Sequence, residues 1–400
     1  MNPGRSRSVT RRPAKTGWRG ILGMDLRRCR QKSALGALSL FFVLGAAASM
    51  SAEKLELPEG FSLWQRSAHL RVGAGYKDNV TLSHFDPPSS AFEMASADVM
   101  LFRLPWNNWD FSLMGVASDV RYFRESIGVD AEQNAAVSSQ LGWFMSEGWK
   151  STTALQYVFI NQVMDVSAVY GAAVREQVHG HGITLTEGVR RDAAPWWAEL
   201  SLLGSLYYFR QPLDDYWQAG PRISLGCYYG HGSEIGLSYQ AFPQAYDSRE
   251  QTDPTGAPVP GTRLRYWSQQ AELSWQHNWD EQRRWRSITR CGFEHNQDNG
   301  SGYYDYLQYR IAEQLRYRAA GWDFSVQGAL AYYDFPRQAL SLTDPRLRHR
   351  TSIHLTVRGE KSLSKHWRIC AAYDYERSLS NQTVEQYRAN TASAGVDFEF

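Results

Sequence analysis

The chain has 400 residues, of which 43% are hydrophobic, 14% aromatic and 21% charged, and its mean hydropathy is −0.49. This composition is too apolar for a disordered chain, and too hydrophilic for a protein with several transmembrane helices of ~20 apolar residues each. The formal net charge of +2 is unevenly spread, because the first 52 residues hold ten Lys and Arg against one acid. The remainder carries about −7, so a basic surface is not indicated and we expect no nucleic-acid partner.

A basic stretch followed by a short apolar run opens the chain. The run is uncharged over residues 33–52 and ends in small residues. A basic flank, a short apolar segment and small residues are the three parts of a secretory signal peptide. We expect residues 1–52 to be a cleaved signal peptide, with translation starting at Met1 or Met24, and residues 53–66 to be a short periplasmic lead-in. The alternative is a single transmembrane anchor, for which the apolar run is short.

From Ala68 onward, apolar residues recur at every second position with polar or small residues between them. Residues 217–229, 322–333 and 351–358 show this pattern. Such alternation indicates strands with one apolar and one polar face. Several of these runs are about twice as long as the usual strand of ~5–6 residues, and reach the ~9–11 residues that a tilted strand needs to cross a bilayer.

The connections between these strands alternate between short and long. The short ones fall at residues 105–108, 146–148, 191–195, 230–232, 280–284, 319–321 and 362–366, and the longer ones at 77–91, 123–133, 161–178, 209–215, 243–263, 295–303, 335–347 and 378–386. Outer-membrane barrels have this asymmetry, with short periplasmic turns and long external loops, and their backbone must close on itself in lipid. We therefore predict an all-β, transmembrane, antiparallel up-and-down β-barrel of about 16 strands over residues 67–400, with 14 to 18 strands open. The alternative is a large soluble β-sandwich.

Tryptophan follows six of the seven short connections. The six residues are Trp109, Trp149, Trp196, Trp285, Trp322 and Trp367. An indole settles where hydrocarbon meets water, because it has an apolar body and one N–H donor. We expect these residues to form an aromatic girdle at the periplasmic interface.

The last strand ends in a pattern that carries a resemblance. Ser393 to Phe400 alternates, with apolar side chains at even positions up to Phe398 and Phe400 and with Gly395 among the inward ones. This pattern resembles the C-terminal assembly signal of bacterial outer-membrane proteins, and the residues that match the signal are Gly395, Phe398 and Phe400. The resemblance implies folding by the barrel assembly machinery into the bacterial outer membrane, in contact with its lipid.

Residues 70–80 read Leu-Arg-Val-Gly-Ala-Gly-Tyr-Lys-Asp-Asn-Val and contain a G-Y-x-D-N-V element. This strand is similar to the opening strand of β-barrel porin families, some of which are encoded near exopolysaccharide export systems. The resemblance implies a porin-like barrel and supplies no site residues.

The polar faces of the strands carry many charges. The side chains that we expect to line a pore are Arg71, Arg222, Arg286, Arg290, Arg310, Arg316, Arg358, Arg368, Glu234 and Glu272. Arginine binds carboxylates and phosphates with a planar fork, so these side chains could select polar or anionic solutes. The alternative is that they pair with neighbouring acids and only hold the barrel together. Glu313 falls on the apolar face, where we expect an error of register.

The sequence gives little sign of catalysis or of a cofactor. His179 and His181 flank one glycine near a long connection, where solvated histidines are more common than a metal site. No Ser/His/Asp set has a recognisable context, so we expect no enzyme, no metal and no cofactor. The leading interpretation is a channel for small hydrophilic solutes or for an oligo- or polysaccharide. The alternative is a structural or surface-interaction barrel with a blocked lumen and functional external loops, chiefly residues 243–263.

Overall fold

The computed structural model describes residues 62–124, 128–167, 175–210, 213–341 and 343–400. The predicted signal peptide and most of the predicted lead-in lie outside the described residues. Within the described ranges, no helix has the length and apolar character needed to cross a membrane.

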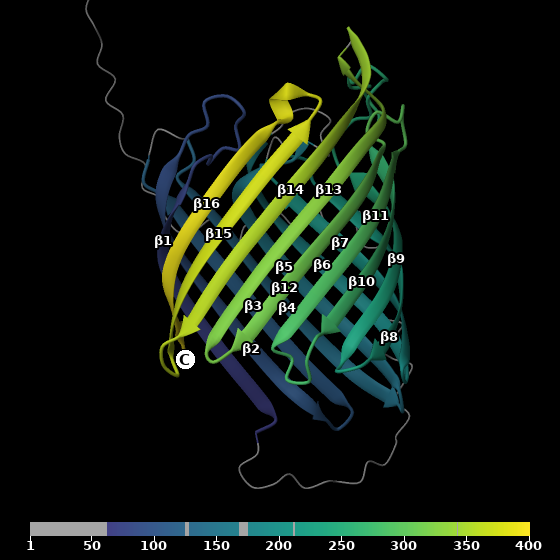
Figure 1. The fold of residues 1–400 in the computed structure, drawn as a ribbon. Coiled ribbons are helices and arrows are strands. Elements are labelled where there is room, and N and C mark those ends of the chain that lie inside the picture. The colour runs from purple at the N-terminus through teal and green to yellow at the C-terminus, as the bar shows by residue number, and fades with distance from the viewer. Residues whose placement is uncertain (1–61, 125–127, 168–174, 211–212, 342) are drawn as a thin grey trace, which may run out of the picture. The chain divides into compact units, whose positions relative to one another are not determined.

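Sixteen antiparallel strands form one closed barrel, in which each strand pairs with its neighbours in sequence and β1 pairs with β16 (Figure 1). The strands are β1 Trp64–Lys77, β2 Ser90–Trp106, β3 Trp109–Tyr122, β4 Ala131–Ser146, β5 Trp149–Asp165, β6 Arg175–Ala193, β7 Trp196–Phe209, β8 Tyr216–Tyr229, β9 Ser233–Tyr246, β10 Arg265–Asn278, β11 Trp285–Asp298, β12 Tyr306–Ala319, β13 Trp322–Ser341, β14 Asp344–Ser362, β15 Trp367–Ser380 and β16 Tyr387–Glu399. The predicted fold class and strand number are confirmed.

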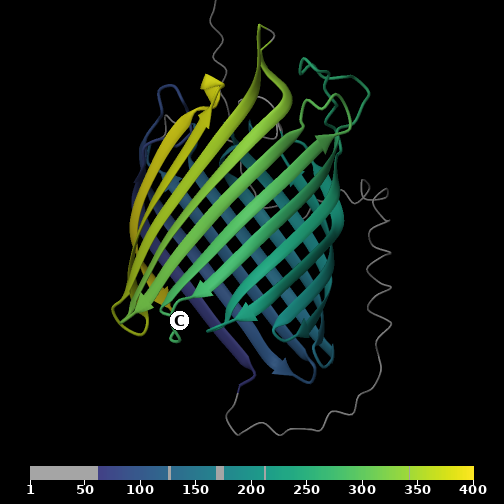
Figure 2. The same cartoon turned by 45° about the vertical axis from the view of Figure 1, so that its right-hand side comes forward.

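Short turns close one end of the barrel and longer connections rise at the other (Figures 1 and 2). The turn between β2 and β3 is only two residues long because Asn107 and Asn108 both adopt positive φ, 54° and 64°. Two such residues match the right-handed twist of the flanking strands. At the opposite end, a short 3-10 helix, Thr383–Glu385, lies between β15 and β16.

Several predicted connections are partly strand, and the difference is largest at two of them. Residues 335–347 were expected to be a long connection, but β13 runs to Ser341 and β14 begins at Asp344. The ladder between them shifts register between Asp334 and Ala339, and such a bulge breaks the alternation that the prediction depends on. Likewise β5 and β6 extend into the expected connection 161–178, and β1 begins at Trp64, inside the expected lead-in.

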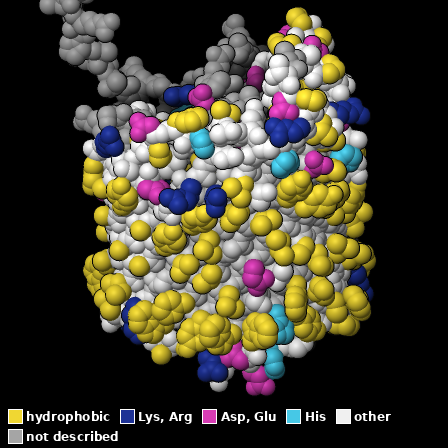
Figure 3. All heavy atoms as spheres, turned by 45° about the horizontal axis from the view of Figure 1, so that its top comes forward, with side chains coloured by type: hydrophobic (Ala, Val, Ile, Leu, Met, Phe, Trp, Pro, Cys, Tyr) yellow, Lys and Arg dark blue, Asp and Glu magenta, His cyan; other side chains and the backbone are white. Residues whose placement is uncertain are grey.

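The two faces of the barrel follow the period of two. Across the closing seam Leu70 pairs with Phe398 and Val72 with Val396, and all four are outward. The outer surface is a broad apolar belt with few charges, bordered by polar side chains (Figure 3). Because the strand ladders close into a ring with no free edge and the coat is apolar, this is the architecture of a transmembrane barrel of the bacterial outer-membrane type.

Two carboxylates interrupt the apolar belt. The ladders place Glu313 outward, opposite Thr289, so the expected error of register at Glu313 is wrong. The hydroxyl of Thr289 donates a hydrogen bond to Glu313. On β6, Glu187 is also outward and accepts a hydrogen bond from Thr153 at 2.8 Å. Each carboxylate therefore has a threonine of the preceding strand as its partner.

Candidate functional site: the lumen

The inward face of the barrel is the candidate site. Ion pairs cross several strands on this face, which only side chains on the concave side of a closed sheet can do. Arg71 on β1, for example, reaches Glu360 on β14 at 2.8 Å, although β15 and β16 lie between the two strands. The register places every predicted pore-lining side chain on this inward face.

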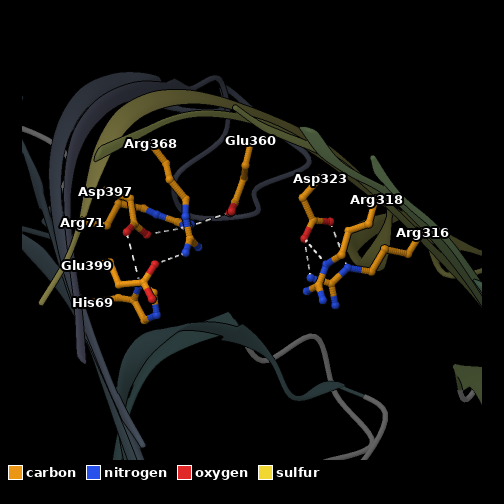
Figure 4. Close-up of polar contacts among 9 residues, drawn as sticks. All are labelled: His69, Arg71, Arg316, Arg318, Asp323, Glu360, Arg368, Asp397 and Glu399. Carbon is orange, nitrogen blue, oxygen red and sulfur yellow. Dashed lines mark hydrogen bonds and ion pairs between the residues drawn. The ribbon is translucent and has the colours of Figure 1, made fainter. Parts of the chain in front are cut away.

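A cluster of charges lies near the periplasmic end of β14, β15, β16 and β1; we call it the seam cluster (Figure 4). Its members are His69, Arg71, Glu360, Arg368, Asp397 and Glu399. Arg71 bridges Glu360 and Asp397, and His69 Nδ1 lies 3.3 Å from the same Asp397. Arg368 pairs with Glu399. Asp397 is only 3% exposed, so its ion pair with Arg71 is partly shielded from water. The cluster therefore links the first strand of the barrel, β1, to the last strands, β14 to β16.

A second group gathers on β12 and β13 (Figure 4). Arg316 donates to both oxygens of Asp323, at 2.9 and 2.5 Å, and Arg318 adds a third hydrogen bond at 2.8 Å. Farther up the wall Arg310 pairs with Glu272 on β10. Arg286 donates to the amide oxygen of Gln276 at 2.5 Å.

Other predicted charges have no such partner. Among the described residues, Arg222, Arg290, Arg358 and Glu234 make no hydrogen bond or ion pair with another side chain, and the three guanidinium groups are exposed to the lumen. An unpaired charge is costly to bury in a dry interior. These groups therefore require water inside the barrel, and the lining is a mixture of scaffold pairs and free charges.

The wall formed by β2 to β5 is less polar than the sequence suggested. Its inward positions include Met100, Met114 and Val116, which are 44%, 52% and 46% exposed. Val116, Val158 and Ile160 border a hollow of about 300 Å³, which Asp98 also lines. The prediction that each strand has one apolar and one polar face does not hold at these positions, because some inward side chains here are apolar.

Inward-facing apolar side chains also gather at the extracellular end. Val80 and Leu82, from the connection after β1, pack in two small clusters, with Phe92 and Tyr387 among their partners. A third cluster joins Tyr246, Leu264 and Tyr266. These contacts hold parts of the long connections against the rim of the barrel.

The tip of β5 crosses the lumen and contacts β14, nine strands further along the chain. The backbone carbonyl of Ser167 accepts a hydrogen bond from Arg348 at 2.9 Å, and its hydroxyl accepts one from Arg350 at 2.7 Å. Arg350 also pairs with Asp165 at 2.8 Å. We call these residues, together with Gln338 and Glu385, the mouth cluster.

The mouth cluster is almost completely shielded from water. Arg348 is 1% and Glu385 0% exposed, and Arg348 donates to Glu385, to Gln338 at 2.6 Å and to Ser167. Period-two reasoning did not find it, because its members come from the ends of β5, β13 and β14 and from the 3-10 helix. It narrows the extracellular end of the lumen.

The connection expected to be functional, residues 243–263, corresponds to residues 247–264. Leu264 packs on tyrosines of the adjoining wall, Arg249 lies over Tyr304 of the neighbouring connection, and Thr252 pairs with Pro258. Hydrogen bonds from the Thr255 hydroxyl and from backbone amides hold the pKa of the Asp253 carboxyl below its usual range. The segment is an ordered structure at the rim beside the neighbouring connection, and the contact across the lumen comes from β5 instead.

The six tryptophans of the predicted girdle are the first residues of β3, β5, β7, β11, β13 and β15. All six are outward by register, and basic side chains accompany three of them. Arg103 stacks on Trp109 at 3.3 Å, Lys361 on Trp322 at 4.8 Å and Arg191 on Trp149 at 5.3 Å. A cation beside an indole suits the polar border of a membrane.

The remaining sequence candidates are placed as follows. His179 and His181 lie outward on β6, and His181 Nδ1 is 2.7 Å from the Tyr157 hydroxyl. Among the residues that the structure describes, no three His, Cys, Asp or Glu side chains gather as a metal site. Gly395 lies inward, opposite Gly73, and Phe398 lies outward against Trp367.

The comparisons with known proteins give no family. No family model matches the chain, and no curated protein matches it. Among solved structures it is similar to OccAB1 of Acinetobacter baumannii (10% identity, TM-score 0.45, 84% of this chain and 96% of that one). It is also similar to a loop-deletion mutant of OmpT, an outer membrane protein of Vibrio cholerae, with 11% identity and a TM-score of 0.42 over 85% of this chain and 100% of that one. A third similar structure is OccK9 (OpdG) of Pseudomonas aeruginosa, with 9% identity and a TM-score of 0.43 over 84% of this chain and 98% of that one.

Proposed function

We propose that this barrel is a porin-like channel of the bacterial outer membrane that passes small polar solutes, saccharides included, after export with a cleaved signal peptide and insertion by the barrel assembly machinery. One observation carries the proposal: Arg222, Arg290 and Arg358 project into the lumen without a counter-ion in the described chain. Guanidinium groups in that state need water around them. A continuous column of water is what a hydrophilic solute requires.

The charges of the lining favour polar solutes in general and do not select solutes of one charge sign. Free arginines on β8, β11 and β14 are accompanied by free acids on β2 and β9, Asp98 and Glu234. The walls therefore carry charges of both signs, which set a field across the lumen and orient a solute that is itself dipolar or bears hydroxyl groups. No catalytic or cofactor role is part of this proposal.

The test is liposome swelling with refolded protein and sugars of increasing size, together with single-channel conductance. We expect swelling with small sugars that falls with solute size. The variant Arg290→Ala/Arg310→Ala should shift the reversal potential in a salt gradient toward cations, because it removes one free guanidinium and leaves Glu272 unpaired. An unchanged reversal potential would show that these residues only hold the wall together.

The mouth cluster favours a second candidate, a barrel that is closed at its extracellular end and acts through its outer surface. A protein of that kind would give neither swelling nor conductance. Swelling that appears only after the contact between β5 and β14 is broken would support this second candidate over a permanently open channel.

A further inference from the structure

Two arginines face each other on the outward side of the barrel, near the extracellular ends of β15 and β16. Arg377 and Arg388 are direct partners in the ladder, and both are exposed. Like charges directly opposite each other destabilise a strand pair. An arrangement of this kind is favourable when an anion lies between the two guanidinium groups.

The described chain does not supply that anion. Neither guanidinium makes a hydrogen bond or an ion pair with any described residue. The one carboxylate that shares their surroundings, Asp78, is already engaged. Its two oxygens accept hydrogen bonds from the backbone and side-chain nitrogens of Asn390, at 2.7 and 2.5 Å.

A hollow of about 370 Å³ lies beside the two arginines. It is lined by Arg377 and Arg388 together with Asn79, Ser83 and His84, among others. The backbone here is fixed, since Asn79 donates to the carbonyl of Arg388 at 2.9 Å and to that of Ser83 at 2.8 Å. Asp78 lines the hollow as well, so it combines two cations, one carboxylate and hydrogen-bonding side chains, with an excess of positive charge.

The height of Arg377 and Arg388 along the barrel axis shows which layer of the membrane they face. Arg388 precedes Phe398, which packs on Trp367 at the periplasmic end, by ten residues of β16. At ~3.3 Å per residue and a tilt of ~40°, this places Arg388 about 25 Å above Phe398, which is the height of the apolar band of such barrels. Figure 3 shows charged side chains of both signs, Lys and Arg among them, just above the apolar belt. The pair thus lies at the level of the outer-leaflet headgroups.

We propose that Arg377 and Arg388 bind the phosphate of an outer-leaflet lipid headgroup. Two guanidinium groups offer several N–H donors to phosphate oxygens and remain charged at any physiological pH. Basic pockets on membrane proteins bind phosphorylated headgroups in this way. The outward orientation, directly above the apolar belt, favours a lipid phosphate over a free phosphate ion, because the acyl chains can lie along the belt below.

The test measures lipid retention by the refolded full-length barrel in detergent, using native mass spectrometry with diphosphorylated lipid A as the probe. We expect retention by the unmodified protein and at least a tenfold weaker affinity for Arg377→Gln/Arg388→Gln. The matched control is Arg265→Gln, which removes a single outward, exposed arginine at the extracellular end of β10 and should leave affinity unchanged. A shift in gel migration on heating verifies folding of each variant, and the single change Arg377→Gln provides a milder second variant.

Two further arms separate the sources of phosphate. The same lipid with its phosphates removed should bind no better to the unmodified protein than to the double variant. Inorganic phosphate in millimolar excess should displace little of the intact lipid. Equal binding of the stripped lipid, or full retention by the double variant, would overturn the proposal. Arginine-dependent binding of inorganic phosphate alone, as tight as that of the lipid, would reassign the site to a free anion.

Discussion

Arg348 illustrates what one residue does at the mouth of the barrel. It is 1% exposed and is held by Glu385, Gln338 and Ser167. Removing one partner of a buried ion pair leaves the other charge uncompensated, at a cost of about 3–5 kcal/mol. We expect Arg348→Met to weaken the contact between the tip of β5 and β14, which Arg350 alone then maintains through Ser167 and Asp165. A higher conductance would report the weaker contact.

The double variant Arg348→Met/Glu385→Gln is the matched control for this prediction. It removes both charges, so most of the cost of the single change should be recovered even though the contact is lost. The free energy of unfolding in urea should therefore rank unmodified protein, double variant and single variant in descending order. Equal stability of the single and double variants would show that the ion pair is not the source of the effect.

Sequence reasoning predicts the orientation of a residue in this barrel more easily than its partner. The inward side of Arg316 and of Arg71 follows from alternation alone. The partner of Arg316, Asp323, lies across a short turn and is accessible to local reasoning. The partner of Arg71, Glu360, is 289 residues away, and the two meet only because the sheet closes. Pairings that depend on closure or on chain ends, such as the mouth cluster, leave no periodic signal.

At the scale of single strands, Glu313 gives a direct test of the lipid-facing side of β12. Charged residues on this side are destabilising in a depth-dependent way, less so for Glu than for Arg or Lys. Glu313→Leu should therefore raise the free energy of unfolding in lipid vesicles by about 1 kcal/mol. The contrasting change is Glu272→Leu on the inward face, which should bring no such gain, because it removes an ion pair with Arg310 and places a leucine against the water of the lumen. A loss of stability with Glu313→Leu would mean that the hydrogen bond from Thr289 outweighs the cost of placing the carboxylate against lipid.

The strand ends show where period-two reasoning stops. It predicted about sixteen strands because apolar and polar or small residues alternate over most of their membrane-crossing parts. It missed the extension of β13 and β14 because the register shifts between Asp334 and Ala339. It missed the inward course of the β5 tip because that segment has left its pairing with β4, which ends at Asn161. Outside the membrane-crossing parts, the connections are held by contacts between residues that show no regular spacing in the sequence.

The whole molecule depends on one seam, where the first strand pairs with the last. Gly73 and Gly395 are direct partners there, and a Cβ at residue 395 would lie 2.5 Å from the Val72 carbonyl oxygen and 3.1 Å from Gly73 Cα. Both contacts are with backbone, which cannot move aside without opening the ladder. We expect Gly395→Ala to lower the folded fraction severalfold when the denatured chain is diluted into lipid vesicles that contain no assembly machinery.

Gly328 is the matched control, since it lies mid-strand on the outward face and a Cβ there meets nothing within 4 Å. Gly328→Ala should fold like the unmodified chain, as measured by the heat-dependent shift in gel migration. The comparison separates two roles for Gly395, because vesicles without the machinery report only on packing at the seam. Normal folding of Gly395→Ala in vesicles, combined with failure to assemble in cells, would assign the glycine to recognition of the C-terminal signal rather than to closure of the barrel.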